Sequence, residues 1–336
     1  MMLAGILAIS IIVSEGPKFV AADAPSGAEF TLHRVVGNGE ASHPVFSTVS
    51  RKGDTLSLVP TFPLSPGETY EARISVDGDV KERFEYRFQE SSRPPPKLVR
   101  VLPDTGKVPA NLLKFYLEFD QPVREGRTIF DQIHIVDEDG RKVYSPWRRQ
   151  ELWSEDGKRL TLWIHPGRIK QGVNLRQQLG PVLVPGKKYE LLLDASIQSP
   201  EGKKLGKTVR HPFVATADNR SKLDILRWNI KPPVSGEGTL VIETDRALDP
   251  FLVERHLRIF HDDEQLDTSV KWSQSQTKFI FSSPQPWQAG SYRMEVDEYL
   301  EDLAGNTAVR VFDTDLELPT EEASPLARDF VISKQR

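Results

Sequence analysis

Basic and tryptophan side chains gather in one part of the sequence, between residues 145 and 182. The segment Gly167–Val182 (GRIKQGVNLRQQLGPV) contains arginine and lysine but no acidic residue, and the nearby stretch Ser145–Trp153 (SPWRRQELW) adds two arginines and two tryptophans. Tryptophan rings can stack on sugar rings, and guanidinium groups pair with carboxylates or sulfates. Such a loop cluster on a rigid scaffold is typical of a binding site. The candidate ligand-binding residues are Trp147, Arg148, Arg149, Trp163, Arg168, Lys170 and Arg176.

The same segment also has a purely structural interpretation. It stands before a Val-Pro-Gly turn, at a place where an earlier, similar part of the chain has only FPLS. An insertion of this kind could close the open end of a larger domain, with Leu175 and Leu179 packing inward because they lie one helical turn apart. Both interpretations remain open at this stage.

Residue patterns for catalysis or metal binding do not stand out elsewhere. The chain has no cysteine, which excludes disulfides, thiolate metal sites and cysteine nucleophiles. Its seven histidines are scattered, without the spacing of a zinc site, and three methionines give little support to a copper carrier. The acidic turns Asp137–Gly140 and His261–Gln265 lack the ordered series of oxygen ligands that calcium needs. We therefore expect a protein that is not an enzyme and has no cofactor.

Length and charge set further bounds. With 336 residues, 38% hydrophobic and 27% charged, the chain is long enough for two or three domains with cores of their own. A net charge of −4 gives no electrostatic case for nucleic acid. The apolar run Leu3–Val13 is too short to span a membrane. Residues 1–22 are either a signal segment, with Val20–Ala22 as the cleavage site, or contain a first strand at Ile9–Val13.

One sequence pattern occurs three times, about one domain length apart. Each copy has a serine followed six residues later by a strand apolar residue, then a proline, a glycine turn and a tyrosine. The serines are Ser50, Ser154 and Ser273, and the tyrosines are Tyr70, Tyr189 and Tyr292. We expect each tyrosine to bury its ring while its hydroxyl bonds backbone in the turn. The pattern therefore describes a structural corner.

Within each repeat the residues after the serine predict a β-hairpin. Gly53-Asp54 and Asp156-Gly157 lie between alternating apolar positions, whereas the third copy (SQSQTK) lacks glycine and must turn differently. A turn at Asp156-Gly157 places Trp153 opposite Leu160. It also points Trp163 toward the other face, together with Leu152 and Thr161.

Two linkers divide the chain. SSRPPPK (91–97) is rich in proline, and TADNRSK (216–222) is short and polar. They predict a first module at 1–92, a second at 96–217 with its insertion at 167–182, and a third at 221–317. Residues 318–336 are expected to form a tail.

Several motifs carry a resemblance to a known family. LSPGETYEARI and LVPGKKYELLL resemble the corner that enters the penultimate strand of fibronectin type III and related Ig-like domains. VLPDTGKVPANLLKFYLEFDQPV, IHIVDEDGRKV, SPEGKKL and EDLAGNTAV resemble bacterial SbsA-type Ig-like domains. The resemblance implies β-sandwiches of exported or cell-surface proteins that act as spacers or adhesive modules. It also implies a tyrosine-corner role for Tyr70, Tyr189 and Tyr292.

Together these observations predict an all-β chain of three tandem immunoglobulin/fibronectin III-like β-sandwich domains, the middle one enlarged by an insertion. The leading functional prediction is a non-catalytic structural or adhesive protein, exported to the periplasm, cell surface or beyond. Its expected partner is an unknown protein or glycan, with no nucleic acid and no transmembrane span. The alternatives are a carbohydrate-binding protein that uses Trp147, Trp163 and the insertion, or an uncharacterised enzyme.

Overall fold

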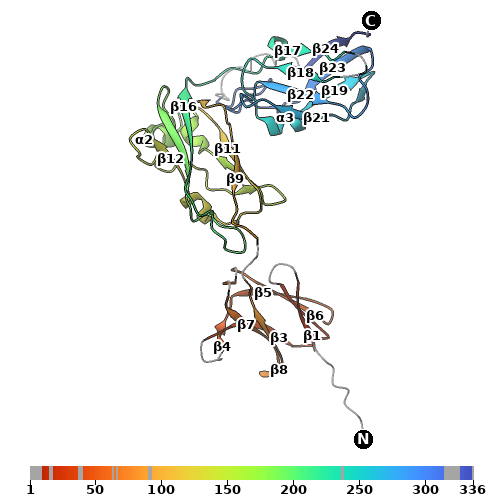
Figure 1. Cartoon of the computed structure of the whole chain (residues 1–336). Coiled ribbons are helices and arrows are strands. Elements are labelled where there is room, and N and C mark those ends of the chain that lie inside the picture. Colours follow the sequence, from red (N-terminus) through yellow and green to blue (C-terminus); the bar gives the residue numbers. More distant parts are fainter. Residues whose placement is uncertain are drawn as a thin grey trace. The chain divides into compact units, whose positions relative to one another are not determined.

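The structure of the chain is a computed structural model (Figure 1). It describes residues 10–14, 18–36, 41–62, 64–65, 67–89, 93–234, 236, 238–313 and 326–334. Over these residues the strands assemble into six sheets of four strands each. The sheets face each other in pairs, so the fold consists of three successive β-sandwiches, as the sequence predicts.

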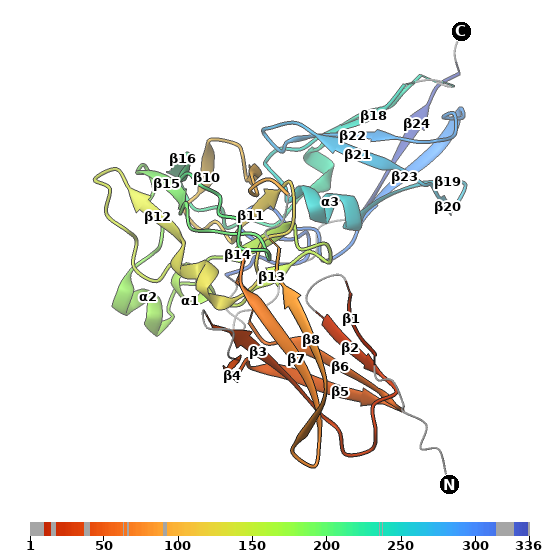
Figure 2. The same ribbon diagram turned by 60° about the horizontal axis from the view of Figure 1, so that its bottom comes forward.

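The first sandwich packs the sheet β1-β2-β6-β5 against the sheet β4-β3-β7-β8, as Figure 2 shows. Alternation along β7 buries Tyr70, Ala72 and Ile74, which is the pattern of a strand with one face on a core. Gly53, at φ 60°, allows the tight turn between β5 and β6. The strands are β1 (Ser10–Ser14), β2 (Lys18–Ala22), β3 (Glu29–Val35), β4 (Ala41–Pro44), β5 (Ser47–Lys52), β6 (Thr55–Pro60), β7 (Thr69–Val76) and β8 (Asp79–Arg87).

The segment with two alternative expectations forms two strands at residues 10–14 and 18–22. β1 pairs with β2 in antiparallel register, from Ser10 opposite Ala22 to Ser14 opposite Lys18. Ile11 and Ala21 are buried in the core. Val20–Ala22, the candidate cleavage site, therefore lies within a strand of the sandwich, while residues 1–9 lie outside the described part of the chain.

The second sandwich packs the sheet β13-β14-β11-β9 against the sheet β10-β16-β15-β12. Trp153 lies opposite Leu160 and Leu152 opposite Thr161, which confirms the predicted hairpin register. The insertion forms two short helices, α1 and α2. The elements are β9 (Leu98–Leu102), β10 (Lys107–Pro109), β11 (Lys114–Phe119), η1 (Arg127–Asp131), β12 (Ile133–Asp137), β13 (Leu152–Trp153), β14 (Arg159–Trp163), α1 (Pro166–Ile169), α2 (Asn174–Leu179), β15 (Lys188–Leu193) and β16 (Val209–Thr216).

The third sandwich packs the sheet β17-β18-β22-β21 against the sheet β20-β19-β23-β24. Its hairpin turn, which has no glycine, places Gln276 in the left-handed conformation at φ 55°. The elements are η2 (Ile225–Arg227), β17 (Asn229–Lys231), β18 (Leu240–Glu243), α3 (Pro250–His256), β19 (Leu257–His261), β20 (Glu264–Gln265), β21 (Ser269–Trp272), β22 (Lys278–Ser282), β23 (Gly290–Val296) and β24 (Ala327–Ile332).

The prediction of a tail at residues 318–336 is wrong for Ala327–Ile332. These residues form β24, which pairs with β23 along six residues. The Phe330 ring stacks on Tyr292 with 5.5 Å between ring centroids, and the Arg328 guanidinium donates to the carbonyl of Ile225 at 3.2 Å. The strand completes the sheet of the third sandwich, although a long segment separates it from β23. Residues 318–325 of the predicted tail lie outside the described residues.

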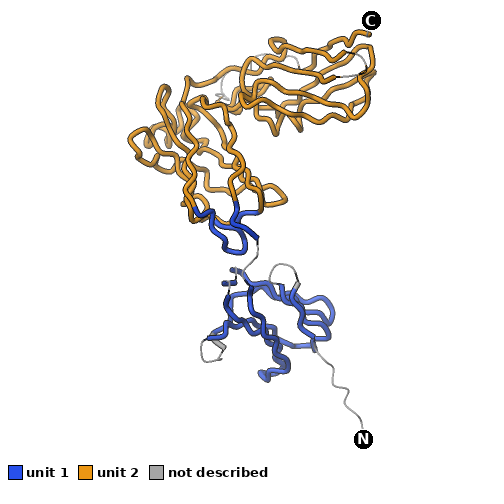
Figure 3. The backbone as a smooth tube through the Cα atoms, in the orientation of Figure 1, with its two compact units in different colours: residues 1–96, 122–124, 198–206 blue, residues 97–121, 125–197, 207–336 orange. Residues whose placement is uncertain are grey.

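By contacts between residues, the chain divides into two compact units (Figure 3). One contains residues 1–96, 122–124 and 198–206, and the other contains residues 97–121, 125–197 and 207–336. The second unit thus joins most of the second sandwich to all described parts of the third. Within the described residues, no helix is long and apolar enough to cross a membrane.

Candidate functional site

The three repeated tyrosines are structural corners, as predicted. All three rings are buried, and each hydroxyl bonds backbone four or five residues upstream. In two corners the hydroxyl accepts from an amide rather than donating to a carbonyl, whereas the third does both. The bonds join Tyr70 to Ser65 at 2.8 Å, Tyr189 to Val184 at 3.0 Å, and Tyr292 to Gln288 at 3.0 Å.

Trp147 lies in the core of the second sandwich. Only 4% of its surface is exposed, its Nε1 donates to the carbonyl of Ile133 at 2.8 Å, and its ring meets Phe115 edge-on. A sugar ring cannot reach it. The prediction that Trp147 binds a ligand is therefore wrong, because the tryptophan satisfies its polar group within the core.

Arg168 is buried as well, with 3% exposure, and it holds the insertion together. Its guanidinium donates to the carbonyls of Gly180 at 3.0 Å, Pro181 at 3.1 Å and Leu179 at 3.2 Å, and also to Tyr144. Burial lowers the pKa of Arg168. A guanidinium whose donors point at the carbonyls of its own loop cannot bind a ligand, so this prediction is also wrong.

The other cations of the insertion contact nearby parts of the protein. Arg176 donates to the carbonyls of Arg168 at 2.7 Å and Ile169 at 2.9 Å, and the Lys170 ammonium lies 5.1 Å from the ring centroid of Phe312. These contacts support the structural interpretation of the insertion. Its predicted apolar packing is uneven, since Leu175 is half-buried but Leu179 is 39% exposed.

Arg148 and Arg149 are exposed, and Arg149 pairs with Asp131 at 2.7 Å. Trp163 is half-buried on the other face of the sheet β13-β14-β11-β9, where the Lys114 ammonium lies 5.4 Å from its ring centroid. The predicted residues therefore do not converge on one site. For Arg148, Arg149, Trp163, Lys170 and Arg176, ligand binding stays a prediction.

The face of the sheet β13-β14-β11-β9 that carries Trp163 contacts the third sandwich. Lys114, on β11, forms ion pairs with Asp249 at 2.8 Å and with Glu301 at 2.9 Å, and Tyr116 donates to Asp249 at 2.6 Å. Lys114 is 8% exposed and Asp249 1% exposed. We call Lys114, Tyr116, Asp249 and Glu301 the charged cluster.

Helix α3 is the element of the third sandwich that lies on this face. Asp249 caps the helix by accepting from the amides of Phe251 and Leu252 at 3.1 and 3.3 Å. The Phe251 ring meets Tyr116 edge-on with centroids 4.8 Å apart, and the Arg159 guanidinium lies 3.9 Å from its centroid. The same side chains that begin the helix thus attach it to the second sandwich.

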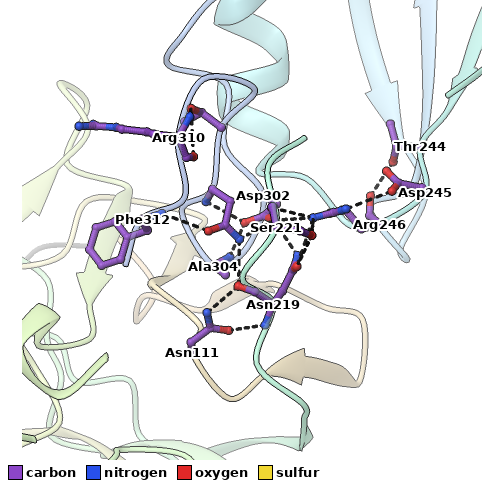
Figure 4. Close-up of polar contacts among 12 residues, drawn as sticks. Asn111, Asn219, Ser221, Thr244, Asp245, Arg246, Asp302, Ala304, Arg310 and Phe312 are labelled. Atoms are coloured by element: carbon purple, nitrogen blue, oxygen red, sulfur yellow. Dashed lines mark hydrogen bonds and ion pairs between the residues drawn. The ribbon is translucent and has the colours of Figure 1, made fainter. Parts of the chain in front are cut away.

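A second group of polar side chains lies beside the charged cluster, where the linker between the two sandwiches passes the turn Asp302–Asn306 (Figure 4). Asn219, in the linker, bonds Asn111 on one side and donates to Asp302 at 2.7 Å on the other. Asn306 donates to the carbonyl of Asn219 at 3.0 Å, and Arg246 approaches Asp302 at 3.5 Å. We call Asn111, Asn219, Arg246, Asp302 and Asn306 the turn cluster.

At the turn cluster the backbones of the second and third sandwiches also approach each other closely. The amide of Leu113 donates to the carbonyl of Leu303 at 2.9 Å. A Cβ added to Gly305 would lie 2.5 Å from a Leu113 methyl carbon, and Gly305 has φ 80°. Glycine is needed here both for the turn and for contact with the second sandwich. We call the whole contact, with the charged cluster and the turn cluster, the joint.

The environment of the joint shifts several pKa values. Burial is the largest single effect and lowers the pKa of Lys114, but Asp249, Tyr116 and Glu301 together outweigh it, so the net pKa is raised and the ammonium stays charged. Burial and Asp249 both raise the pKa of Tyr116, which keeps its hydroxyl protonated. Burial raises the pKa of Asp302 to about 6, although bonds from Asn306 oppose the shift.

Lysine, tyrosine and aspartate at these distances could move protons in an enzyme, but here they have no room for a substrate. The cavity lined by Lys114, Tyr116 and Asp249 has a volume of about 10 Å³, at the lower limit for a single water molecule. Among the described residues, no group of three or more acidic or histidine side chains could hold a metal ion. The charged cluster connects two domains.

Sequence reasoning did not identify the joint, although two signals were present. Lys114 interrupts the apolar run LLKFYLEF, and a charge in a buried strand requires a partner. The motif EDLAGNTAV was noted only as a family turn, whereas its Asp302 and Asn306 also bond the linker.

No protein-family model matches the chain, and no curated protein sequence matches it. Among solved structures, the chain is similar to a chimeric titin Z1Z2 functionalised with a decorin peptide (12% identity, 60% of this chain and 88% of that chain, TM-score 0.29). It is also similar to the I67–I69 fragment of titin (8%, 96% and 94%, 0.20). A third similarity is to the N-terminal part of the bacterial S-layer protein SbsC (15%, 60% and 40%, 0.27). These identities and TM-scores are too low to indicate a function.

Proposed function

We propose that the chain is a non-catalytic structural or adhesive protein, exported or displayed at the cell surface, in which the second and third sandwiches act as one rigid element. The joint carries this proposal. Its charged cluster is buried and ion-paired between the two sandwiches, and its turn cluster fixes the linker between them.

The second and third sandwiches are expected to form a rigid pair because bending between them would break the charged cluster. Domains of one chain generally move relative to each other unless their interface is large and specific. Here, separating α3 from β11 would leave the Asp249 carboxylate without Lys114 and Tyr116, and an unpaired buried charge is costly. A rigid pair of sandwiches is useful in a spacer, which must hold its length and direction under load.

The remaining parts of the proposal are supported by the sequence. A chain without cysteine can work in an oxidising compartment, and Ig-like sandwiches serve as spacers and adhesive modules at cell surfaces. The proposed partner is a protein or glycan at that surface. An absence of the protein from the envelope and medium of its host would contradict the export part.

Spin-label distances test the rigid joint in the full chain. Since the protein has no cysteine, Gln178→Cys and Glu264→Cys place one label on each sandwich without background labelling. We expect one narrow distance distribution. The double change Asp249→Asn/Asp302→Asn should broaden it, because each new amide presents an NH2 group to donors across the joint.

A label pair within the third sandwich, Arg227→Cys with Glu264→Cys, is the matched control and should stay narrow in both backgrounds. A broad distribution in the otherwise unchanged protein would refute the rigid joint. An unchanged narrow distribution in the double variant would show that the joint does not depend on these carboxylates.

A further inference from the structure

A groove runs along the joint between the β13–β14 hairpin and helix α3. It has a volume of about 580 Å³, within the range of small-ligand sites. A second hollow of about 350 Å³ shares Ser154, Asp156 and Arg159 with it and continues past the hairpin. The lining residues used below are Leu152, Arg159, Thr161, Leu252 and Arg255.

The groove has two guanidinium groups with unused donors. Arg159 has Glu118 as an ion-pair partner only at 4.0 Å, and Glu118 is already engaged by Arg100 at 2.7 Å. Arg255 is exposed on α3 and forms no ion pair with any residue that the structure describes. Such guanidiniums can bind a carboxylate or sulfate through two parallel hydrogen bonds.

Asp156 and Glu155, at the hairpin tip, differ in how far each is available to neutralise the positive charge of the two arginines. The Asp156 carboxylate accepts from the Ser154 hydroxyl at 2.6 Å and from the Lys158 amide at 3.2 Å, so it is used within its own turn. Glu155 is exposed at the rim. Arg159 and Arg255 therefore give the groove two guanidinium groups that are available to an anion.

The rest of the lining combines apolar and hydroxyl groups. Leu152 is 39% exposed and Leu252 is half-buried, so they offer apolar surface beside the hydroxyl of Thr161. A saccharide presents the same mixture of C–H faces and hydroxyls. An added peptide strand would need a long sheet edge, whereas β13 has only two residues.

We propose that this groove binds an anionic oligosaccharide, with its carboxylate or sulfate groups on Arg159 and Arg255 and its sugar rings along Leu152 and Leu252. The site lies on two sandwiches, so the joint gives it its shape. The inference rests on the adhesive part of the proposed function, for which it names the ligand class.

Glycan binding by the full chain tests the proposal. The protein is applied to an array of uronate and sulfated oligosaccharides together with their methyl-esterified or desulfated forms, and the strongest ligand is then titrated by calorimetry. We expect the anionic forms to bind and the neutralised forms to bind at least about tenfold more weakly. Arg255→Gln should weaken binding by about the same factor. Arg258→Gln, an exposed arginine three residues further on, is the control and should leave binding unchanged.

Three outcomes would overturn the proposal. They are the absence of any glycan signal, equal binding of charged and neutralised glycans, and equal affinity of Arg255→Gln and the unchanged protein. Competition by hexaglutamate as strong as by the glycan would assign the groove to acidic peptides instead. The spin-label result distinguishes the two proposals. A narrow distance with no glycan binding refutes only the groove, whereas a broad distance with binding refutes the rigid joint and shows that the groove does not need it.

Discussion

Replacing Lys114 with methionine removes the positive charge at the centre of the charged cluster while keeping most of the side chain's volume. Asp249 would retain Tyr116 and the two amides of α3, but its charge would have no counterion within the cluster. Breaking a buried ion pair from one side costs about 3–5 kcal/mol. Because urea slopes are about 1–3 kcal/mol per molar, the unfolding midpoint should fall by at least about 1 M.

Tryptophan fluorescence is a suitable assay, because all six tryptophans lie between Trp147 and Trp287, in the second and third sandwiches. The signal therefore follows these two sandwiches and not the first. The effect should be the same at pH 7 and pH 9. The raised pKa of Lys114 means that its stabilising charge is fully present below the unfolded pKa of about 10.4 and is lost only as the pH rises through the folded value.

Two control variants distinguish the loss of the buried ion pair from the loss of any lysine side chain. Lys107→Met changes an exposed lysine of the same sandwich and should shift the midpoint little. The double variant Lys114→Met/Asp249→Asn should be less destabilised than the sum of its parts, because the second change removes the unpaired charge. A midpoint for Lys114→Met close to that of Lys107→Met, or strictly additive effects, would refute the account.

Two further changes test the corner and the turn cluster. Tyr189→Phe should destabilise by about 1–2 kcal/mol in the fluorescence-detected urea transition, because the Val184 amide loses its acceptor, whereas Tyr70→Phe should leave that transition unchanged. Asp302, whose pKa of about 6 exceeds its unfolded value of about 3.9, binds a proton more readily when folded, so its contribution favours folding at low pH and declines as the pH rises through this window. The stability of the unchanged protein relative to Asp302→Asn should therefore increase by about 3 kcal/mol from pH 7 to pH 3, and a constant difference would contradict the shift.

Local features of this chain were predictable, because a short pattern determines them. The register of Trp153 opposite Leu160 follows from one turn and strand alternation, and the tyrosine corners follow from a glycine two or three residues before a tyrosine that enters a strand. The strand β24 was missed because it pairs with β23 across a long segment, and its alternation is weak in isolation.

The candidate site was harder to predict for a different reason. Arg168 in the insertion and Arg255 on α3 are the same residue type in polar surroundings, yet one donates to the carbonyls of its own loop and the other faces solvent. Only the path of the backbone distinguishes them. Likewise, Lys114 meets Glu301 and Tyr116 meets Asp249 across 187 and 133 residues of sequence, and a single sequence does not pair such distant positions.

Asp249 and Asp302 share an arrangement that explains how the third sandwich is fastened to the second. In each, Oδ1 serves the local backbone, by capping α3 at Phe251 in one case and by closing the turn at Ala304 in the other. In each, Oδ2 accepts from outside the local turn, from Lys114 and Tyr116 or from Asn219, although Oδ2 of Asp302 also accepts from Asn306 within its own turn. Asparagine keeps the first oxygen and replaces the second with a donor. The Asp→Asn changes should therefore spare the cap of α3 and the backbone bonds that close the turn while opening the joint, which is the separation that the spin-label experiment requires.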